Sequence, residues 1–339
     1  MSNRDWLGGS AISKFASWLA LAAVGTLTGC SAIQVKLGMR ISLAKTDVAS
    51  MEVSQYKYPG IGPGEKSSLV ATFTQPDGKE LVTEGKGKGK VLWKDLAVTA
   101  TVVSVDKKGV LSLPRDPRVS DGKMGHIAVA VPSHPDLHAD LDIPLRYNYK
   151  FASSYSGNRG SDGANGTSGQ DGLSGLSGSM DPNNPSPGGD GGNGTDGTNG
   201  QDGGPGGDGP AVQVQVALRP GSHPLLQVGV TSPGHKERFY LVDPQGGSLT
   251  INSDGGPGGS GGKGGQGGRG GSGGMGTPSG NSGSSGSNGR DGSDGQSGSG
   301  GSIAVTYDPQ VQPYLATIHL SNPGGPAPVL KQAPVPPLW

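Results

Sequence analysis

The chain has 339 residues, of which 66 are glycine and 27 are proline, while only 31% are hydrophobic and 5% aromatic. One large globular core needs more apolar residues than this, so the composition predicts a smaller conventional domain joined to a glycine-built one. The 27 basic and 27 acidic residues cancel, which argues against the basic surface typical of nucleic-acid-binding proteins.

The first 29 residues have the pattern of a targeting segment. Arg4 and Lys14 give a weakly basic start, and the apolar run from Phe15 to Leu27 is too short to span a bilayer comfortably. The run ends in Leu27-Thr28-Gly29-Cys30, and Cys30 is the only cysteine of the chain. An ordinary secretory signal with an incidental cysteine is the alternative. It is disfavoured because a lone cysteine in an exported protein has no disulfide partner.

This quartet resembles the lipobox of bacterial lipoproteins. The resemblance implies cleavage before Cys30, acylation of its thiol and of the freed amine, and anchoring to a membrane by several acyl chains. Ser31, which is not aspartate, implies by the same resemblance the outer membrane of a Gram-negative bacterium.

Residues 34–156 have an ordinary composition and alternating apolar positions. Residues 69–74, 98–105, 127–131 and 141–149 are rich in β-branched or alternating apolar side chains, and turn signals separate the segments. About eight short strands without a helical period predict a mainly β domain, an antiparallel β-sandwich of the immunoglobulin-like kind.

The glycines are strongly periodic. Windows 157–209 and 255–301 hold 44 of the 66, and glycine recurs at every third position in four runs of eight phased glycines each. A period of three predicts a left-handed extended helix without internal hydrogen bonds, so its backbone groups must pair with neighbours or water. The absent side chain lets another backbone approach closely. The four runs are 157–178, 188–209, 255–276 and 280–301.

Three interpretations of these runs compete. A collagen triple helix of three chains needs more proline than the runs contain, and a disordered Gly/Ser linker needs no phase. An intramolecular bundle of four polyglycine-II helices, lying antiparallel, requires equal lengths, which is what the sequence has. Run 255–276 is almost entirely Gly-Gly-X and has two faces without side chains. We therefore expect 188–209 and 255–276 inside the bundle, and 157–178 and 280–301 outside.

The segments between and after the runs alternate again. Six strands are expected within 211–254 and 302–320, at 211–218, 225–230, 239–242, 248–252, 303–307 and 314–319, and they predict a small β-sheet that caps the bundle. The Pro-rich tail 323–339 is expected to be extended. The predicted organisation is a signal peptide (1–29), a lipidated anchor (30–33), the sandwich (34–156), the glycine domain with its cap (157–322) and the tail (323–339).

The alternation of Gly-Gly-X runs with strands, and the passage Gly300-Gly301-Ser302-Ile303-Ala304-Val305-Thr306-Tyr307-Asp308-Pro309, is similar to the N-terminal domain of the Obg GTPases. That resemblance implies polyglycine-II helices topped by a small β-barrel. No nucleotide-binding pattern accompanies it, so GTPase activity is not carried over. The chain as a whole resembles the collagen-like or glycine-rich surface lipoproteins of bacteria.

Two short motifs suggest chemistry at first sight. Gly60-Ile61-Gly62-Pro63-Gly64-Glu65-Lys66-Ser67 resembles a phosphate-binding loop, but Glu65 occupies the position of a required glycine and no helical pattern follows, so a β-turn loop is expected. The stretch from His134 to Asp140 holds two imidazoles and two carboxylates. Pro135 disfavours the helix that metal-ligand spacing would need, which leaves a polar surface loop.

Two further motifs are weaker. Gly191 to Asp196 is similar to part of a calcium-binding β-roll repeat, but the nine-residue period is missing. The alternative of weak Ca²⁺ binding by the Asp side chains stays open. The segment from Glu84 to Lys90 alternates glycine with lysine and is expected to be a solvated hairpin turn, with contact to anionic lipid or polysaccharide as the alternative.

The sequence thus predicts a lipid-anchored cell-envelope protein with a structural or adhesive role. We expect no catalytic residue, no cofactor apart from the lipid on Cys30, and no metal. We expect a monomer whose partners are the membrane and a polysaccharide or an envelope or matrix protein, and no nucleic acid. The alternatives are a collagen-like trimeric stalk, an enzyme with a dispersed site, and an ice- or mineral-binding surface, whose flat face Arg290, Asp291 and Asp294 would interrupt.

Overall fold

The structure is a computed structural model that describes residues 35, 37, 39–219 and 221–339. The chain divides into two compact units, Met1–Tyr147 and Asn148–Trp339. The prediction of a mainly β protein with antiparallel sheets is confirmed, since 32% of residues are in strands and 7% are helical.

Eight strands and four short 3-10 helices lie in the described part of the first unit. Alternate residues along several strands are buried, as the alternating sequence pattern requires. The strands are β1 (Ser50–Gln55), β2 (Lys66–Thr74), β3 (Glu80–Val82), β4 (Ala97–Thr101), β5 (Ser104–Val105), β6 (Val110–Ser112), β7 (Gly125–Val131) and β8 (His134–Ile143). The 3-10 helices are η1 (Leu43–Lys45), η2 (Gly85–Gly87), η3 (Trp93–Asp95) and η4 (Pro117–Val119).

Among the described residues of this unit, two antiparallel sheets enclose one core. The first has the order β1-β2-β6-β5 with β3 on β2, and the second has the order β4-β7-β8. Phe73 on β2 and Ile127 on β7 are fully buried in the same hydrophobic cluster. The arrangement suits a sandwich, and its immunoglobulin-like character stays a prediction.

One predicted strand is split between the two sheets. The segment 98–105 was expected to be continuous, but β4 ends at Thr101 and β5 begins at Ser104. Val102 between them has φ +66°, which is unusual for a β-branched residue. A left-handed residue turns the chain abruptly, so β4 pairs with β7 while β5 pairs with β6. Side-chain alternation alone does not reveal such a turn.

The second unit also contains two sheets, where a single small sheet was predicted. Its strands are β9 (Lys150–Ser156), β10 (Val212–Arg219), β11 (Leu225–Thr231), β12 (Arg238–Val242), β13 (Ser248–Asp254), β14 (Ile303–Tyr307), β15 (Ile318–Ser321) and β16 (Val329–Gln332), with the 3-10 helix η5 (Pro309–Thr317). One sheet has the order β12-β11-β10-β14-β16 and the other the order β15-β13-β9. Val216, Leu249 and Ile251 are completely buried in their shared core.

Three segments of this unit differ from the sequence prediction. Strand β9 pairs in parallel with β13, so the boundary between the units lies at 147/148 and not at 156. Segment 314–319 is mostly the end of η5, whose Asp308 side chain accepts a hydrogen bond from the Gln310 amide at its start. The tail is extended as expected, but its residues Val329–Gln332 pair with β14 as the edge strand β16.

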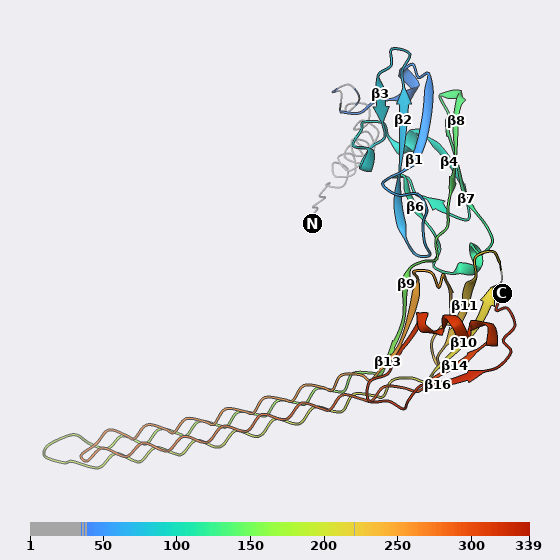
Figure 1. Ribbon diagram of the computed structural model, residues 1–339. Coiled ribbons are helices and arrows are strands. Elements are labelled where there is room, and N and C mark those ends of the chain that lie inside the picture. The colour runs from blue at the N-terminus through green and yellow to red at the C-terminus, as the bar shows by residue number, and fades with distance from the viewer. Residues whose placement is uncertain (1–34, 36, 38, 220) are drawn as a thin grey trace, which may run out of the picture. The chain divides into compact units, whose positions relative to one another are not determined.

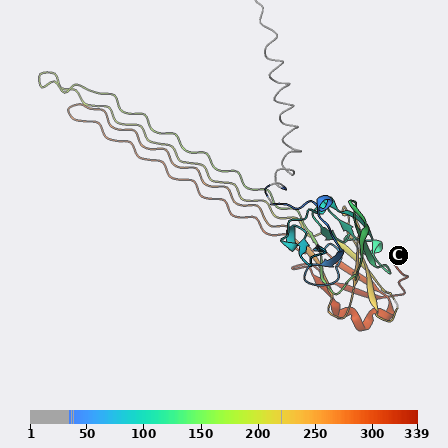
Figure 2. The same cartoon turned by 90° about the horizontal axis from the view of Figure 1, so that it is seen from above.

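The four glycine runs form an array of extended segments. We call runs 157–178, 188–209, 255–276 and 280–301 run 1 to run 4, and together the glycine array. No helix or strand is assigned in any of them, so a four-helix bundle in the sense of internally hydrogen-bonded helices is not supported. Figures 1 and 2 show, from two directions, four traces that run side by side away from the sheets of the second unit.

Backbone hydrogen bonds join the runs in five pairs. Consecutive runs are antiparallel, for example where the Thr198 amide donates to Thr167 O at 2.9 Å. Run 1 is parallel to run 3 and run 2 is parallel to run 4, as in the bond from Gly166 N to Lys263 O at 2.7 Å. Runs 2 and 3 each bond to three neighbours, whereas runs 1 and 4 each bond to two. The prediction that runs 2 and 3 are the inner ones is confirmed.

The Gly-Gly-X pattern of run 3 follows from this inner position. The second glycine of each triplet is buried, and an added Cβ at Gly262 would lie 2.0 Å from Ala164 O. The first glycine faces run 4, where a Cβ at Gly261 would lie 2.1 Å from Gly292 O. Only the third position is exposed, so only there does the sequence place side chains.

Candidate functional site

The predicted lipidation site, Cys30, lies outside the described residues, as does the whole targeting segment. Its lipidation therefore stays a prediction. Within the described residues, no helix is both long enough and apolar enough to cross a membrane.

The loop that resembles a phosphate-binding loop is a turn between β1 and β2, as expected. The Glu65 amide donates to Gly62 O at 3.0 Å, and its side chain accepts from the Gly62 amide at 2.9 Å. A strand, β2, follows at Lys66 in place of a helix. Without a helix N-terminus, the loop lacks the array of amides that holds phosphate in such motifs.

The turn before it, Tyr56 to Gly60, is tightly held and strained. Gln55 binds both backbone groups of Gly60, with its amide donating to Gly60 O at 2.9 Å and its oxygen accepting from Gly60 N at 2.7 Å. Lys57 has φ +74°, and the Tyr58 amide donates to Tyr56 O at 3.2 Å. This is the rarer, strained form of the γ-turn, and such strained residues concentrate at functional sites.

The glycine-lysine segment from Glu84 to Lys90 forms the short helix η2 and a left-handed Lys88, with φ +56°. Thr83 and Val91 form an isolated bridge at its base, so it is a loop with its own 3-10 turn and not a simple hairpin turn. Lys86 extends from it, and its Nζ lies 5.9 Å from the centre of the Tyr56 ring.

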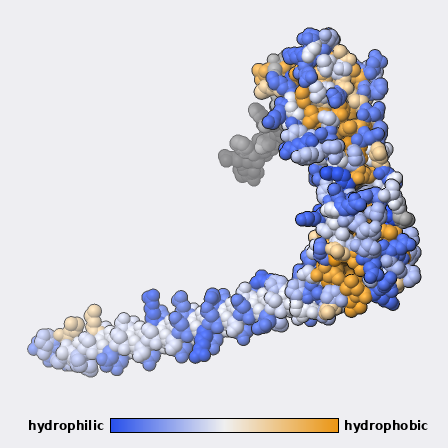
Figure 3. All heavy atoms as spheres, viewed as in Figure 1, coloured by the Kyte–Doolittle hydropathy of each residue, from blue (hydrophilic) through white to orange (hydrophobic). Residues whose placement is uncertain are grey.

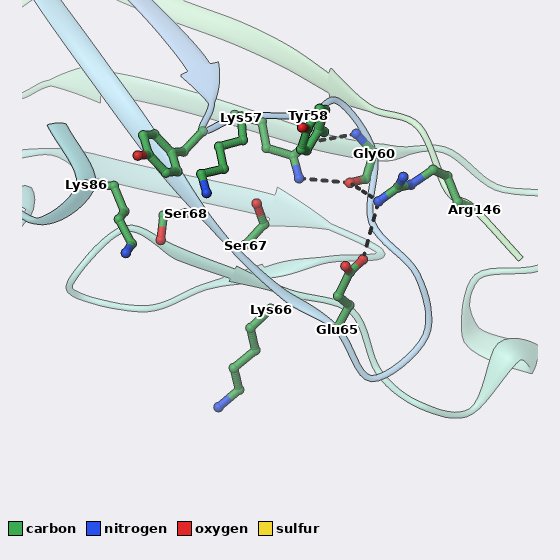
Figure 4. Close-up of a pocket in the computed structure, with 11 residues that line it drawn as sticks. Lys57, Tyr58, Gly60, Glu65, Lys66, Ser67, Ser68, Lys86 and Arg146 are labelled. Carbon is green, nitrogen blue, oxygen red and sulfur yellow. Dashed lines mark hydrogen bonds and ion pairs between the residues drawn. The ribbon is translucent and has the colours of Figure 1, made fainter. Parts of the chain in front are cut away.

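The segment from Gln55 to Ser68 and the glycine-lysine segment lie apart in the sequence. Together they line one surface hollow of about 280 Å³. Residues 55–58, Gly60, residues 65–68, Lys86 and Arg146 form its walls. Figure 4 shows Lys57 and Lys86 on the side of Ser67 and Ser68, with Lys66 extending away from them. The sequence did not indicate that Arg146, which follows β8, reaches the same place.

The hollow carries an excess of positive charge. Its one carboxylate, Glu65, faces Arg146 at 3.6 Å. In the described part of the chain, no carboxylate lies within ion-pair distance of Lys57, Lys66 or Lys86. Lys66 is the weakest of several influences on Asp106, whose pKa is lowered mainly by a hydrogen bond from the Val110 amide. The hollow therefore suits a negatively charged ligand.

The histidine-rich stretch is a strand, β8, and not the expected loop. Its outward face carries His138, Asp140 and Asp142, and His126 on the neighbouring β7 lies between the two carboxylates. His126 Nδ1 is 2.8 Å from Asp142 and its Nε2 is 3.3 Å from Asp140. The described residues contain no group of three or more His, Cys, Asp or Glu suited to hold a metal ion.

Asp196, the acidic residue of the calcium-like motif, lies on run 2 and has a structural partner. Its Oδ1 accepts a hydrogen bond from the Ser287 amide of run 4 at 2.6 Å. Asp190, Asn193, Asn199, Asp202 and Asp208 accept equivalent bonds from run 4 at distances of 2.7–2.8 Å. The repeated Asx residues of run 2 thus bind a neighbouring run.

Apolar side chains gather at the end of the array that is farthest from the sheets. Leu173 and Leu176 on run 1 are 85% and 84% exposed, and Met180 and Met275 are also exposed. On the face that Figure 3 shows, the rest of the array surface is hydrophilic to neutral in hydropathy.

No protein-family model, no curated protein and no solved structure matches this chain.

Proposed function

We propose that this protein is a lipid-anchored cell-envelope protein with a structural or adhesive role, in which the glycine array is a stiff display module. The carrying observation is the array's hydrogen bonding, which links four runs of one chain in five pairs with N···O distances of 2.6–3.0 Å. A linker would have no such pairing. Because the phased amides of runs 1, 2 and 4 and the second glycines of run 3 find acceptors in neighbouring runs, they do not need the partner chains of a collagen-like trimer, which supports a monomer.

We further propose that the runs have the polyglycine-II conformation. The support is the period of the bonds. In runs 1, 2 and 4 the phased glycines donate to one neighbouring run, in run 3 the second glycines of the triplets do so, and successive donors are three residues apart. A threefold extended helix returns to the same face at that interval, with a rise of about 3.1 Å per residue. Eight triplets then make a rod of roughly 70 Å.

The array is suited to rigidity more than to binding through its acidic face. Bending one run against another would break several backbone bonds at once. Many Asp and Asn side chains also bind the amides of a neighbouring run, which leaves fewer of them to contact a ligand. If the array displays the rest of the protein, a ligand would be contacted by surfaces other than the acidic face of the array.

Small-angle scattering of residues 31–339 tests the display module. We expect a monomer with a radius of gyration above the roughly 20 Å of a compact chain of this size. A mass of three chains would favour the trimeric stalk. A radius near 60 Å, as for an unfolded chain, would show that the runs are linkers and would overturn the proposal.

The anchor is tested separately with the full chain expressed in a Gram-negative host. We expect the wild type in the detergent-soluble membrane fraction with an acylated N-terminal peptide by mass spectrometry, and the Cys30→Ser variant without acyl groups. An unmodified Cys30 in the mature wild-type protein would contradict lipidation and leave the display module standing.

A further inference from the structure

We propose that the hollow lined by Lys57, Lys66 and Lys86 binds an acidic saccharide, a sugar chain that carries carboxylate, sulfate or phosphate groups. The inference concerns the first unit alone and does not depend on the glycine array. It rests on three features of the hollow, which are its charge, its preorganisation and its size.

The charge calls for a ligand with several negative groups. Three lysines from different segments line one hollow, although the ammonium group of Lys66 points away from the other two in Figure 4. Glu65, the one carboxylate of the hollow, is paired with Arg146. Like charges repel one another, so gathering them in one place lowers stability unless a ligand or another group offsets the repulsion. An anionic ligand supplies that offset.

Two of the lysines, Lys57 and Lys86, are held near one another by Tyr56. The Nζ atoms of Lys57 and Lys86 lie 5.8 and 5.9 Å from the centre of its ring, within the range of cation–π attraction. Lys57 also has a fixed backbone, because its strained turn is fastened by Gln55 on Gly60. Positions fixed before binding reduce the entropy cost of holding a ligand.

The size and the remaining groups favour a saccharide over a nucleic acid. The volume of about 280 Å³ lies just below the usual range of about 300–1,000 Å³ for ligand pockets, so the hollow suits one or two sugar units of a longer chain. The half-buried Ser67 and Ser68 offer hydroxyl groups for a sugar. Single-stranded nucleic acid is bound by several aromatic faces on which successive bases stack. Of the two tyrosines that line the hollow, Tyr56 already has two ammonium groups near its ring, which leaves Tyr58 alone for stacking. Tyr58, 72% exposed, remains beside the hollow as an apolar surface for one sugar ring.

The test is titration of the full chain with four probes. The acidic probes are oligogalacturonate and a short dextran sulfate, the uncharged control is dextran of equal length, and an oligo(dT) of equal charge represents nucleic acid. We expect both acidic saccharides to bind, more weakly as salt rises, and dextran not to bind. Binding of dextran at equal strength, or tighter binding of oligo(dT) than of both acidic saccharides, would overturn the proposal.

Variants locate the site. The triple variant Lys57→Gln, Lys66→Gln, Lys86→Gln should weaken binding of the acidic probes about tenfold or more, since each exposed ion pair contributes up to about a factor of five. The matched control Lys79→Gln, Lys236→Gln, Lys331→Gln removes the same charge from exposed positions outside the hollow and should bind as the wild type does. An equal loss of affinity in the triple variant and in the control variant would mean that the probes bind through net charge alone, and would overturn the proposed site. Circular dichroism of each variant checks that the β structure is retained.

Tyr56 is a positioning residue in this proposal. Tyr56→Phe keeps the ring and should preserve binding, whereas Tyr56→Leu should weaken it although no charge is lost. Binding at wild-type strength by both variants would show that the ring does not organise Lys57 and Lys86, and would contradict the positioning role of Tyr56.

Discussion

The Arg269 amide donates a 2.7 Å hydrogen bond to the Asp171 carboxylate across 98 residues of sequence. Residues of β9 pair with residues of β13 at the same separation, for example Ser153 with Ile251. Strand β9 continues directly into run 1 and β13 into run 3, so one register extends from the sheet into the array. Runs 2 and 4 share a second register with β10 and β14, at a separation of 91 residues. The sheets therefore set the alignment of the glycine runs.

This shared register makes the array sensitive to unequal lengths. Deleting the single triplet 166–168 should misalign the rest of run 1 with runs 2 and 3 and expose it to proteolysis. A second variant lacks one triplet from each run at the same level of the array, namely 166–168, 197–199, 264–266 and 288–290. This deletion should preserve every pairing and shorten the rod by about 9 Å. Scattering and limited proteolysis measure both effects. If both deletions left the array equally resistant to proteolysis, the alignment of the runs would not depend on equal run lengths.

Two adjacent glycines of run 2 provide a matched test of close packing. An alanine Cβ at Gly191 would lie 2.1 Å from Gly271 O, whereas at Gly192 the nearest atom is Leu173 N at 3.2 Å. Gly191→Ala should break two to four bonds nearby and cost roughly 2–4 kcal/mol of local stability. Gly192→Ala should be near neutral, since Thr195 already occupies the equivalent position one triplet later.

Hydrogen exchange of the run 2, 3 and 4 amides measures this difference. Because each triplet bonds only to triplets at nearly the same level of the other runs, the loss should be confined to the end of the array beyond the substitution. Equal protection in the two variants would mean that the backbones are not packed as closely as the structure indicates.

Asp291 should make the array weaker in acid. Its pKa is lowered first by the hydrogen bond from the Lys263 ammonium and then by that from the Gly264 amide. A lowered pKa in the folded state means that its stabilisation is present above the ordinary value of about 4 and is lost as pH falls through the folded value. The effect is small because the pair is exposed. Array protection should fall less between pH 7 and pH 3 in Lys263→Gln and in Asp291→Asn than in the wild type, and an unchanged fall in both would disprove this role.

His126 has the opposite pH dependence. Its pKa is raised, first by the hydrogen bond with Asp142 and then by the charges of Asp142 and Asp140. Its contribution to stability is therefore full below the ordinary value of about 6.5 and is lost as pH rises through the folded value. NMR titration of the imidazole should show a lower pKa in Asp142→Asn than in the wild type. The stability advantage of the wild type over His126→Gln should be larger at pH 5.5 than at pH 8.5.

Much of the fold could be predicted because its signals are local. A period of three required a backbone face free of side chains, equal run lengths indicated lateral packing, and the second glycine of run 3 indicated an inner position. Alternation located most strands, since it reports which side chains are buried. None of these signals depends on which distant segment becomes the partner.

Tertiary structure decided the partners. Strand β9 joins β13, and residues 329–332 join β14, through pairings that no local pattern encodes, because alternation is the same whichever sheet a strand enters. The candidate site is a similar case. Gly60–Ser67 and Glu84–Lys90 each look like a plain loop in sequence, and only the fold brings Lys57, Lys66 and Lys86 around one hollow, because the chain between these loops returns β3 along β2. By itself the sequence determined the repeat, the strands and the position of the one cysteine, and long-range pairing determined where charge converges.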